Sequence, residues 1–145
     1  MSGFERGAIS RFQEGASMSF PQVIETAEYV SLSTFRRSGK EVKTPVWFAM
    51  YDGAAYIFSE GTAGKVKRLR NSPRSRIAPC TYNGTIVGEW VDSQGFIVTD
   101  KDEIAAAYRA FYQKYGWKVR IFDFFSKLGG KYPKRAMLKL VPSPK

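Results

Sequence analysis

Two turn-forming pairs, Asp52-Gly53 and Asn83-Gly84, constrain the fold of this chain most strongly. Each pair separates runs rich in β-branched and aromatic residues, and Asp-Gly and Asn-Gly favour the two-residue turns of β-hairpins. Hairpins join antiparallel strands, whereas a parallel sheet needs long crossover connections. The spacing predicts strands at 29–36, 41–51, 54–59, 76–81, 85–91 and 135–141. Residues 96–99 either continue the 85–91 strand past a bulge at Gln94-Gly95 or form another strand.

Helices are predicted around this sheet. One or two turns come after Pro21, with Val23, Ile24 and Ala27 facing inward. A short basic helix begins after Gly64 and stops at Pro73. Later in the chain, a capping box at Asp100 and Glu103 starts a helix that Gly116 ends. One stripe of that helix carries the apolar and aromatic residues Ile104, Tyr108, Phe111, Tyr112 and Tyr115.

A second helix is predicted from the apolar spacing at 121–128. Pro45 lacks a backbone donor, so its position in the second strand predicts a sheet edge, a bulge or a strand start. Strands joined by hairpins without βαβ units favour a barrel. The fold class is therefore mainly β with peripheral helices, an antiparallel barrel of six or seven strands. We expect residues 1–19 to form an N-terminal arm and residues 20–145 a single domain.

Composition excludes several kinds of site. Histidine is absent and Cys80 is the only cysteine, which removes His-dependent nucleophile pairs, zinc clusters and intrachain disulfides. We expect Cys80 to be a buried strand residue and the protein to bind no metal. The net charge of +10 favours anionic partners. No segment resembles a membrane span or a signal core, so we expect a cytoplasmic protein without membrane association.

The segment from Ser59 to Arg70 is a candidate anion-binding loop. Two glycines precede a basic helix, and the first N–H groups of a helix are unpaired donors at the positive end of its dipole. Lys65 and Arg68 are three residues apart and share one face, while Val66 and Leu69 share another. A solvated basic helix and a nucleic-acid patch are the alternative interpretations. The charge is spread along the chain rather than in one stripe, so we do not expect a nucleic-acid partner.

Five short segments carry a resemblance to a known family. They are 32–40 (LSTFRRSGK), 44–48 (TPVWF), 64–70 (GKVKRLR), 78–80 (APC) and 114–116 (KYG). In this order they resemble the FMN-binding split-barrel superfamily, the pyridoxamine-phosphate-oxidase-like proteins. Within it they are most similar to the small deazaflavin-dependent oxidoreductases that use coenzyme F420. The resemblance spans about residues 20–142.

The resemblance implies a split barrel that forms a homodimer, with the cofactor at the subunit interface. It places the cofactor phosphate at Ser59, Gly64, Lys65 and either Lys67 or Arg68. It places the ring and ribityl chain along Thr44, Pro45, Val46 and Trp47. From the residues alone, Trp47 fits a packed core position better than a ring-stacking one, and both stay open. Arg36, Arg37 and Lys40 surround a turn, where they are either solvated or in contact with the acidic tail of the deazaflavin.

The resemblance further implies hydride transfer from reduced coenzyme F420 to a small, electron-poor substrate. Because no acid–base dyad or nucleophile can be assembled from the sequence, the cofactor would supply the chemistry. Water, Tyr51 and Tyr82 remain open as proton donors. The alternatives are an FMN-dependent oxidoreductase of the same fold and a non-catalytic protein that binds a cofactor or tetrapyrrole.

Overall fold

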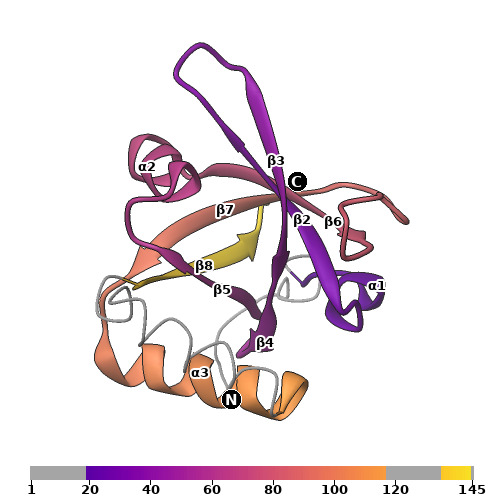
Figure 1. Ribbon diagram of the computed structural model, residues 1–145, viewed down its shortest axis with the longest axis vertical. Helices are drawn as coiled ribbons and strands as arrows, with labels where there is room; N and C mark the ends of the chain where they lie inside the picture. Colours follow the sequence, from indigo (N-terminus) through magenta and orange to yellow (C-terminus); the bar gives the residue numbers. More distant parts are fainter. Residues whose placement is uncertain (1–18, 117–134, 145) are drawn as a thin grey trace, which may run out of the picture.

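The strands pair into one antiparallel sheet that curls on itself (Figure 1). The computed structural model describes residues 19–116 and 135–144. Seven strands form the sheet: β2 (Tyr29–Phe35), β3 (Glu41–Trp47), β4 (Ala49–Tyr51), β5 (Ala54–Glu60), β6 (Arg74–Cys80), β7 (Val91–Val98) and β8 (Arg135–Pro142). Their order is β3-β2-β6-β7-β8-β5-β4. Only Phe48 separates β3 from β4 in the chain, although these strands lie at opposite ends of the order. The sheet therefore curls into a split barrel, which confirms the predicted fold class.

Helices cover two parts of this barrel: α2 (Gly64–Asn71) contacts β2 and β7, and α3 (Lys101–Tyr115) contacts β4 (Figure 1). The short helix α1 (Gln22–Glu25) lies against β6. In α2 the apolar pair Val66 and Leu69 is buried, as its spacing predicts. No helix in the described ranges is long and apolar enough to cross a membrane.

Two clusters of buried side chains hold these layers together. The first fills the barrel, where Leu32, Ile57 and Leu138 pack beneath Val66 of α2. The second lies between α3 and the sheet, and Phe111 of α3 packs there with Tyr56 of β5. β5 is buried on both faces because its alternate side chains contribute to both clusters.

The Asp52-Gly53 hairpin is confirmed. Asp52 and Gly53 have φ values of 51° and 78°, the positive region that a two-residue hairpin turn requires at both central positions. They join β4 to β5, with Tyr51 opposite Ala54. The position of Pro45 is also confirmed as a sheet edge, because β3 pairs with β2 on one side and ends the strand order.

The Asn83-Gly84 turn forms, but the predicted strand at 85–91 is wrong. The turn is closed by hydrogen bonds between Thr81 and Thr85 and between Gly84 and Thr81. Beyond it, only an isolated bridge joins Ile86 to Cys80. The Pro79 carbonyl accepts a bond from Val87, but proline has no N–H to return, so a ladder cannot propagate there. The next strand, β7, begins at Val91 and runs through Gln94-Gly95 in continuous register without a bulge.

Two side chains predicted to face inward are exposed instead. Val23 is 53% exposed on α1, whereas Ile24 is buried. Tyr112 is 38% exposed on α3, whereas Ala107, which is not part of the predicted stripe, is buried against the sheet. One of the two hydrogen bonds of the predicted capping box forms at the start of α3, where Asp100 accepts a bond from the Glu103 N–H. The Glu103 carboxylate instead accepts a bond from the Tyr56 hydroxyl. The predicted arm at 1–19 (except Ser19) and the helix at 121–128 lie outside the described residues.

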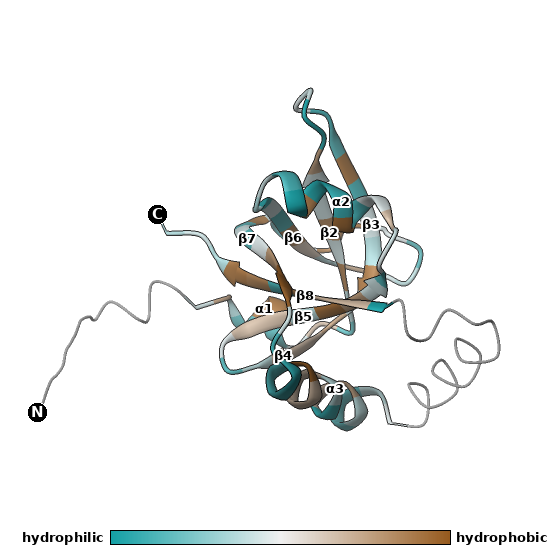
Figure 2. Cartoon of the chain, turned by 90° about the vertical axis from the view of Figure 1, so that its left-hand side faces the viewer, coloured by the Kyte–Doolittle hydropathy of each residue, from teal (hydrophilic) through white to brown (hydrophobic). Residues whose placement is uncertain are grey.

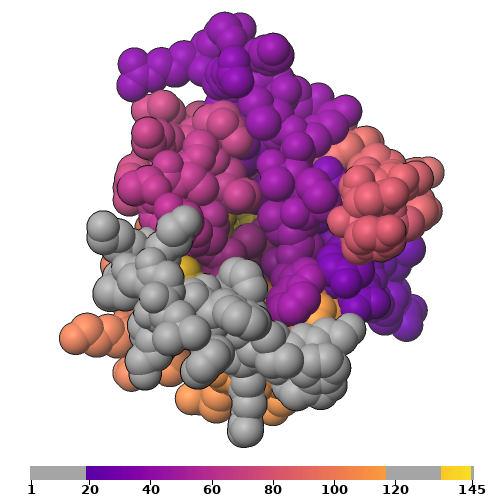
Figure 3. Space-filling view, in the orientation of Figure 1, coloured from indigo at the N-terminus to yellow at the C-terminus, as the bar shows by residue number. Residues whose placement is uncertain are grey.

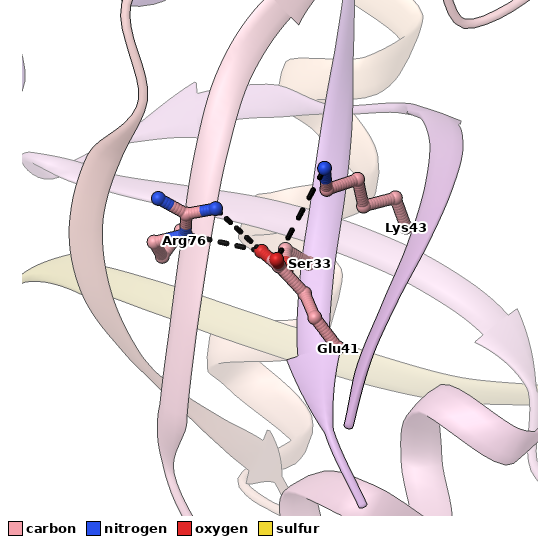
Figure 4. A network of polar contacts seen from close by, with 4 residues as sticks. All are labelled: Ser33, Glu41, Lys43 and Arg76. Atoms are coloured by element: carbon pink, nitrogen blue, oxygen red, sulfur yellow. Dashed lines mark hydrogen bonds and ion pairs between the residues drawn. The ribbon is translucent and has the colours of Figure 1, made fainter. Parts of the chain in front are cut away.

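A carboxylate ties together the three strands at one end of the sheet order. Glu41 of β3 accepts two bonds from Arg76 of β6, with Oε2 2.6 Å from Nη2 and 3.1 Å from Nε, and one from Ser33 of β2 (Figure 4). Lys43 lies on the same strand as Glu41, with its Nζ atom 4.0 Å from Glu41 Oε1. The bond from Ser33 and then the guanidinium of Arg76 lower the pKa of the Glu41 carboxylate, although burial opposes them.

Candidate functional site

The start of α2 presents unpaired donors. Its N-cap residue, Ala63, has extended backbone geometry and no side-chain acceptor, so the first N–H groups of the helix have no side-chain cap. Polar residues predominate along α2, which lies beside the hairpin of β2 and β3 (Figures 2 and 3). A bond from Arg37 Nη2 to Asn71 Oδ1, 3.0 Å long, links this hairpin to the end of α2. The resulting surface can receive an anion.

Arg68 is fixed at this helix start. Its Nε donates to the hydroxyl of Thr34 on β2 over 2.6 Å. The guanidinium lies over Gly64, where a Cβ atom would be only 2.6 Å from Nη1. The glycine therefore leaves the space that the guanidinium occupies, and the bond to Thr34 leaves the two terminal nitrogens for another acceptor. Such a fork matches the geometry of a phosphate or carboxylate.

Positive charges are concentrated at this helix start. Burial and the charge of Arg68 lower the pKa of Lys65, and burial and the charge of Arg36 lower the pKa of Arg68. Among the described residues, none of the ion pairs involves Lys65, Arg68 or Arg36. An anion bound between Lys65 and Arg68 would relieve this repulsion.

The predicted site residues on the strands divide between the two faces of the sheet. Thr44 and Val46 lie opposite Leu32 and Val30, whose side chains fill the barrel. Ser59 is two positions beyond Ile57 on β5 and is buried on that same face. Thr44, Val46 and Ser59 therefore share the interior face that α2 covers.

Pro45 and Trp47 project to the opposite face. The Trp47 ring stacks on Tyr115 of α3, with centroids 4.6 Å apart and planes 11° from parallel. Trp47 is therefore packed against α3, which is one of the two roles that the sequence allows; the other is stacking on the cofactor ring. Pro45 lies beside the 83–84 turn, where a Cβ on Gly84 would be 3.7 Å from its Cγ. The side chains of Pro45 and Trp47 therefore lie on the other face of β3 from those of Thr44 and Val46.

Of the two basic residues that are alternatives on sequence, Arg68 carries its guanidinium back to Gly64 at the helix start. Lys67 is exposed and is not among the residues that lower the pKa of Lys65. Sequence reasoning misses Thr34, which anchors Arg68, because a contact between residues 34 positions apart has no local signal. It also misses that the charge of Arg36, a residue placed at a turn, acts on Arg68.

The described residues offer little other chemistry. They hold no cluster of ligating side chains for a metal ion. Cys80 is 7% exposed at the end of β6 and burial raises its pKa, which confirms the predicted buried strand cysteine. A hollow of about 350 Å³ between β7, β8 and α3 includes Glu103 and Lys139, which already pair over 3.1 Å. None of the predicted site residues lines it.

Three solved structures place this fold among known proteins. A protein of unknown function from Agrobacterium tumefaciens matches with a TM-score of 0.61 and 16% identity, covering 81% of this chain and 49% of its own. This chain thus spans about half the length of that protein. The heme storage protein of Vibrio cholerae matches with a TM-score of 0.63 and 13% identity, over 86% of this chain and 87% of that one.

The third is from Clostridium acetobutylicum, a protein related to general stress protein 26 and of the pyridoxinephosphate oxidase family. It matches with a TM-score of 0.57 and 15% identity, over 83% of this chain and 79% of that one. No protein-family model and no curated protein sequence matches the chain. Identities this low carry the fold alone. The chain therefore has the split-barrel fold of the pyridoxamine-phosphate-oxidase-like proteins.

Proposed function

We propose that this protein binds a phosphate-bearing cofactor of the flavin type and acts as an oxidoreductase on a small electron-poor substrate. Coenzyme F420 is the cofactor that we propose, with FMN as the alternative. The observation that carries the proposal is the arrangement at the start of α2. Lys65 and Arg68 face an uncapped helix start, Gly64 leaves room for the guanidinium, and Thr34 holds it in place. These residues fit a phosphate group by charge and by donor geometry.

The rest of the cofactor would extend from this phosphate along the barrel. Thr44 and Val46, half-buried on the β3 edge, would supply a hydroxyl group and an apolar contact, and Ser59 at the end of β5 would supply a second hydroxyl. Pro45 and Trp47 would contribute through the backbone of the free β3 edge. Bound in its reduced form, the deazaflavin would supply a hydride. The chain would bind and orient it.

The choice of coenzyme F420 over FMN rests on charge. Both cofactors carry a phosphate, but the deazaflavin also has an acidic tail. Arg36, whose charge acts on Arg68, adds a cation next to the phosphate position, and Arg37 and Lys40 lie on the same hairpin beside α2. The net charge of +10 also favours the ligand with more negative charge. FMN bound at the same residues is the alternative.

We also propose that the protein is a homodimer with the cofactor site at the subunit interface. Two features support it. The β3 edge is paired on one side, and the loop between β6 and β7 exposes Tyr82 (76%), Val87 (61%) and Ile86 (37%). A second copy that covered this loop would remove apolar surface from water.

A parallel fluorescence titration with coenzyme F420, FMN and hemin tests the proposal. We expect micromolar or tighter binding of the deazaflavin, weaker binding of FMN and none of hemin. Tight binding of FMN alone would keep the phosphate site and replace the cofactor. Hemin binding alone would favour the non-catalytic tetrapyrrole-binding function, as in the heme storage protein of similar fold. Binding of none of the three would refute the enzyme proposal.

A further inference from the structure

The break between β3 and β4 is held by the end of α3. Phe48 is the single residue between these strands, and its side chain is fully buried. A buried backbone outside a strand ladder still needs partners for its N–H and C=O groups. Both partners come from α3, 66 and 67 positions along the chain.

Two consecutive residues of α3 make these contacts. The Tyr115 hydroxyl accepts a bond from the Phe48 N–H at 3.1 Å and lies 2.6 Å from the carbonyl oxygen of Glu28, to which it donates. Lys114 Nζ donates to the Phe48 carbonyl at 2.8 Å, and its ammonium lies 3.4 Å from the centroid of the Phe48 ring. The peptide groups on both sides of Phe48 are thus fixed from outside the sheet.

The same tyrosine also holds the preceding residue. Trp47 stacks on the Tyr115 ring, which in turn lies 5.9 Å from the ring of Phe111. β3 is an edge strand that pairs only with β2, so its last residues lack a second neighbour that would fix them laterally. Tyr115 and Lys114 supply that support at the end of the 44–47 segment.

We propose that Tyr115, together with Lys114, is a positioning residue that sets the place of the β3 edge along the cofactor ring. This inference rests on the proposed function, because it assigns the ring to the 44–47 segment. Both residues lie on α3, which contacts β4, whereas the phosphate residues Lys65 and Arg68 lie on α2, which contacts β2 and β7. Loss of the hydrogen bonds from Tyr115 and Lys114 to the Phe48 backbone would therefore weaken binding of the cofactor ring and leave binding of the phosphate unchanged.

The test compares Tyr115→Phe and Lys114→Met with the wild type, using coenzyme F420, FMN and inorganic phosphate as ligands. Tyr115→Phe keeps the stacked ring and removes the hydroxyl, and Lys114→Met keeps the length of the side chain and removes the donor. We expect the Kd of the preferred cofactor to rise roughly three- to tenfold in each variant, the effect of one or two lost hydrogen bonds. The Kd of inorganic phosphate should not change. Lys101→Met is the matched control for Lys114→Met, because Lys101 lies exposed at the opposite end of the same helix.

The outcomes separate the two proposals. If the wild type binds neither cofactor, the proposed function fails. If the wild type binds a cofactor and both variants bind it equally well, the positioning role is wrong while the function stands. If the variants lose phosphate and cofactor affinity together, the effect is a general loss of structure and the positioning role is also refuted. Lys114→Met decides the question if Tyr115→Phe does not fold.

Discussion

At the residue scale, the candidate site depends on contacts that differ in how well the sequence predicts them. The shared face of Lys65 and Arg68 comes from helical spacing, and the burial of Val66 and Leu69 comes from the same period. The bond from Arg68 to Thr34 has no local pattern behind it, because it depends on how α2 docks on β2. The same holds for the stacking of Trp47 on Tyr115, which gives this tryptophan the packed position that the sequence favours over ring stacking.

Lys65 should contribute directly to cofactor binding. In Lys65→Ala we expect the binding of coenzyme F420 to weaken by about 1.5–3 kcal/mol, or roughly 10- to 150-fold in Kd, because a charged hydrogen bond to the phosphate is lost. Folding should be unaffected, since the side chain is only partly buried at a helix start. Lys67→Ala, on the exposed side of the same helix, is the control and should leave the Kd unchanged. Equal affinities of Lys65→Ala and wild type, by fluorescence titration, would disprove the phosphate assignment.

Gly64 should matter for binding and not for stability. In Gly64→Ala a Cβ atom 2.6 Å from Arg68 Nη1 would displace the guanidinium, which is the flexible end of a side chain. Because alanine favours helices, we expect the unfolding free energy to change by less than about 0.5 kcal/mol. The affinity for inorganic phosphate should fall roughly threefold or more. Arg68→Lys should give a similar loss, because it keeps the charge but not the bond geometry. A large drop in melting temperature with normal phosphate binding would contradict this account of the glycine.

At the scale of elements, turn chemistry predicts the connections better than it predicts the segments beyond them. Asp52-Gly53 specifies both its turn and its strands, since both flanking segments have ladder partners. Asn83-Gly84 specifies its turn, but the next segment meets Pro79 and has exposed side chains such as Val87, so no ladder forms. The break of the predicted 41–51 strand at Phe48 also escapes prediction, because the contacts from α3 that stabilise it are distant in sequence.

The Glu41 network should make the sheet sensitive to acid. Its pKa is lowered in the folded state, so the carboxylate stabilises the fold above its unfolded value of about 4.5. This contribution is lost as the pH falls through the lower folded value. We expect Glu41→Gln to reduce the free energy of unfolding by about 1 kcal/mol near pH 7, and the difference from wild type to shrink toward pH 3. Urea unfolding at both pH values measures it, with the exposed Glu25→Gln as control. A difference that grew on acidification would show that the sign is wrong.

At the scale of the whole molecule, the sequence predicts an antiparallel barrel, and the structure confirms it as a split barrel of seven strands. Hairpin turns and the period of the helices are sufficient for this, because most strands that follow each other along the chain are also neighbours in the sheet. The pairings of β2 with β6 and of β5 with β8, which skip intervening strands, require the tertiary fold. The resemblance that the five segments carry agrees with the fold of the solved structures, while the cofactor and the assembly stay predictions.

The assembly prediction concerns the loop between β6 and β7. If this loop lies in a dimer interface, a charge at Val87, which is 61% exposed, would be buried without a partner and would oppose association. We expect wild-type protein at micromolar concentration to sediment as a dimer, and Val87→Lys to shift toward monomer. Val23→Lys adds the same charge at a valine on α1 that is 53% exposed, and it should remain dimeric.

Cofactor binding then shows whether the site is shared between subunits. A shared site predicts that Val87→Lys weakens coenzyme F420 binding, and that raising the protein concentration restores it by mass action. Val23→Lys should bind as wild type does at every concentration. A monomeric wild type would overturn the dimer. A dimer whose dissociation leaves the Kd unchanged would place the whole cofactor site within one chain, because no residue of the second copy would then contribute to binding.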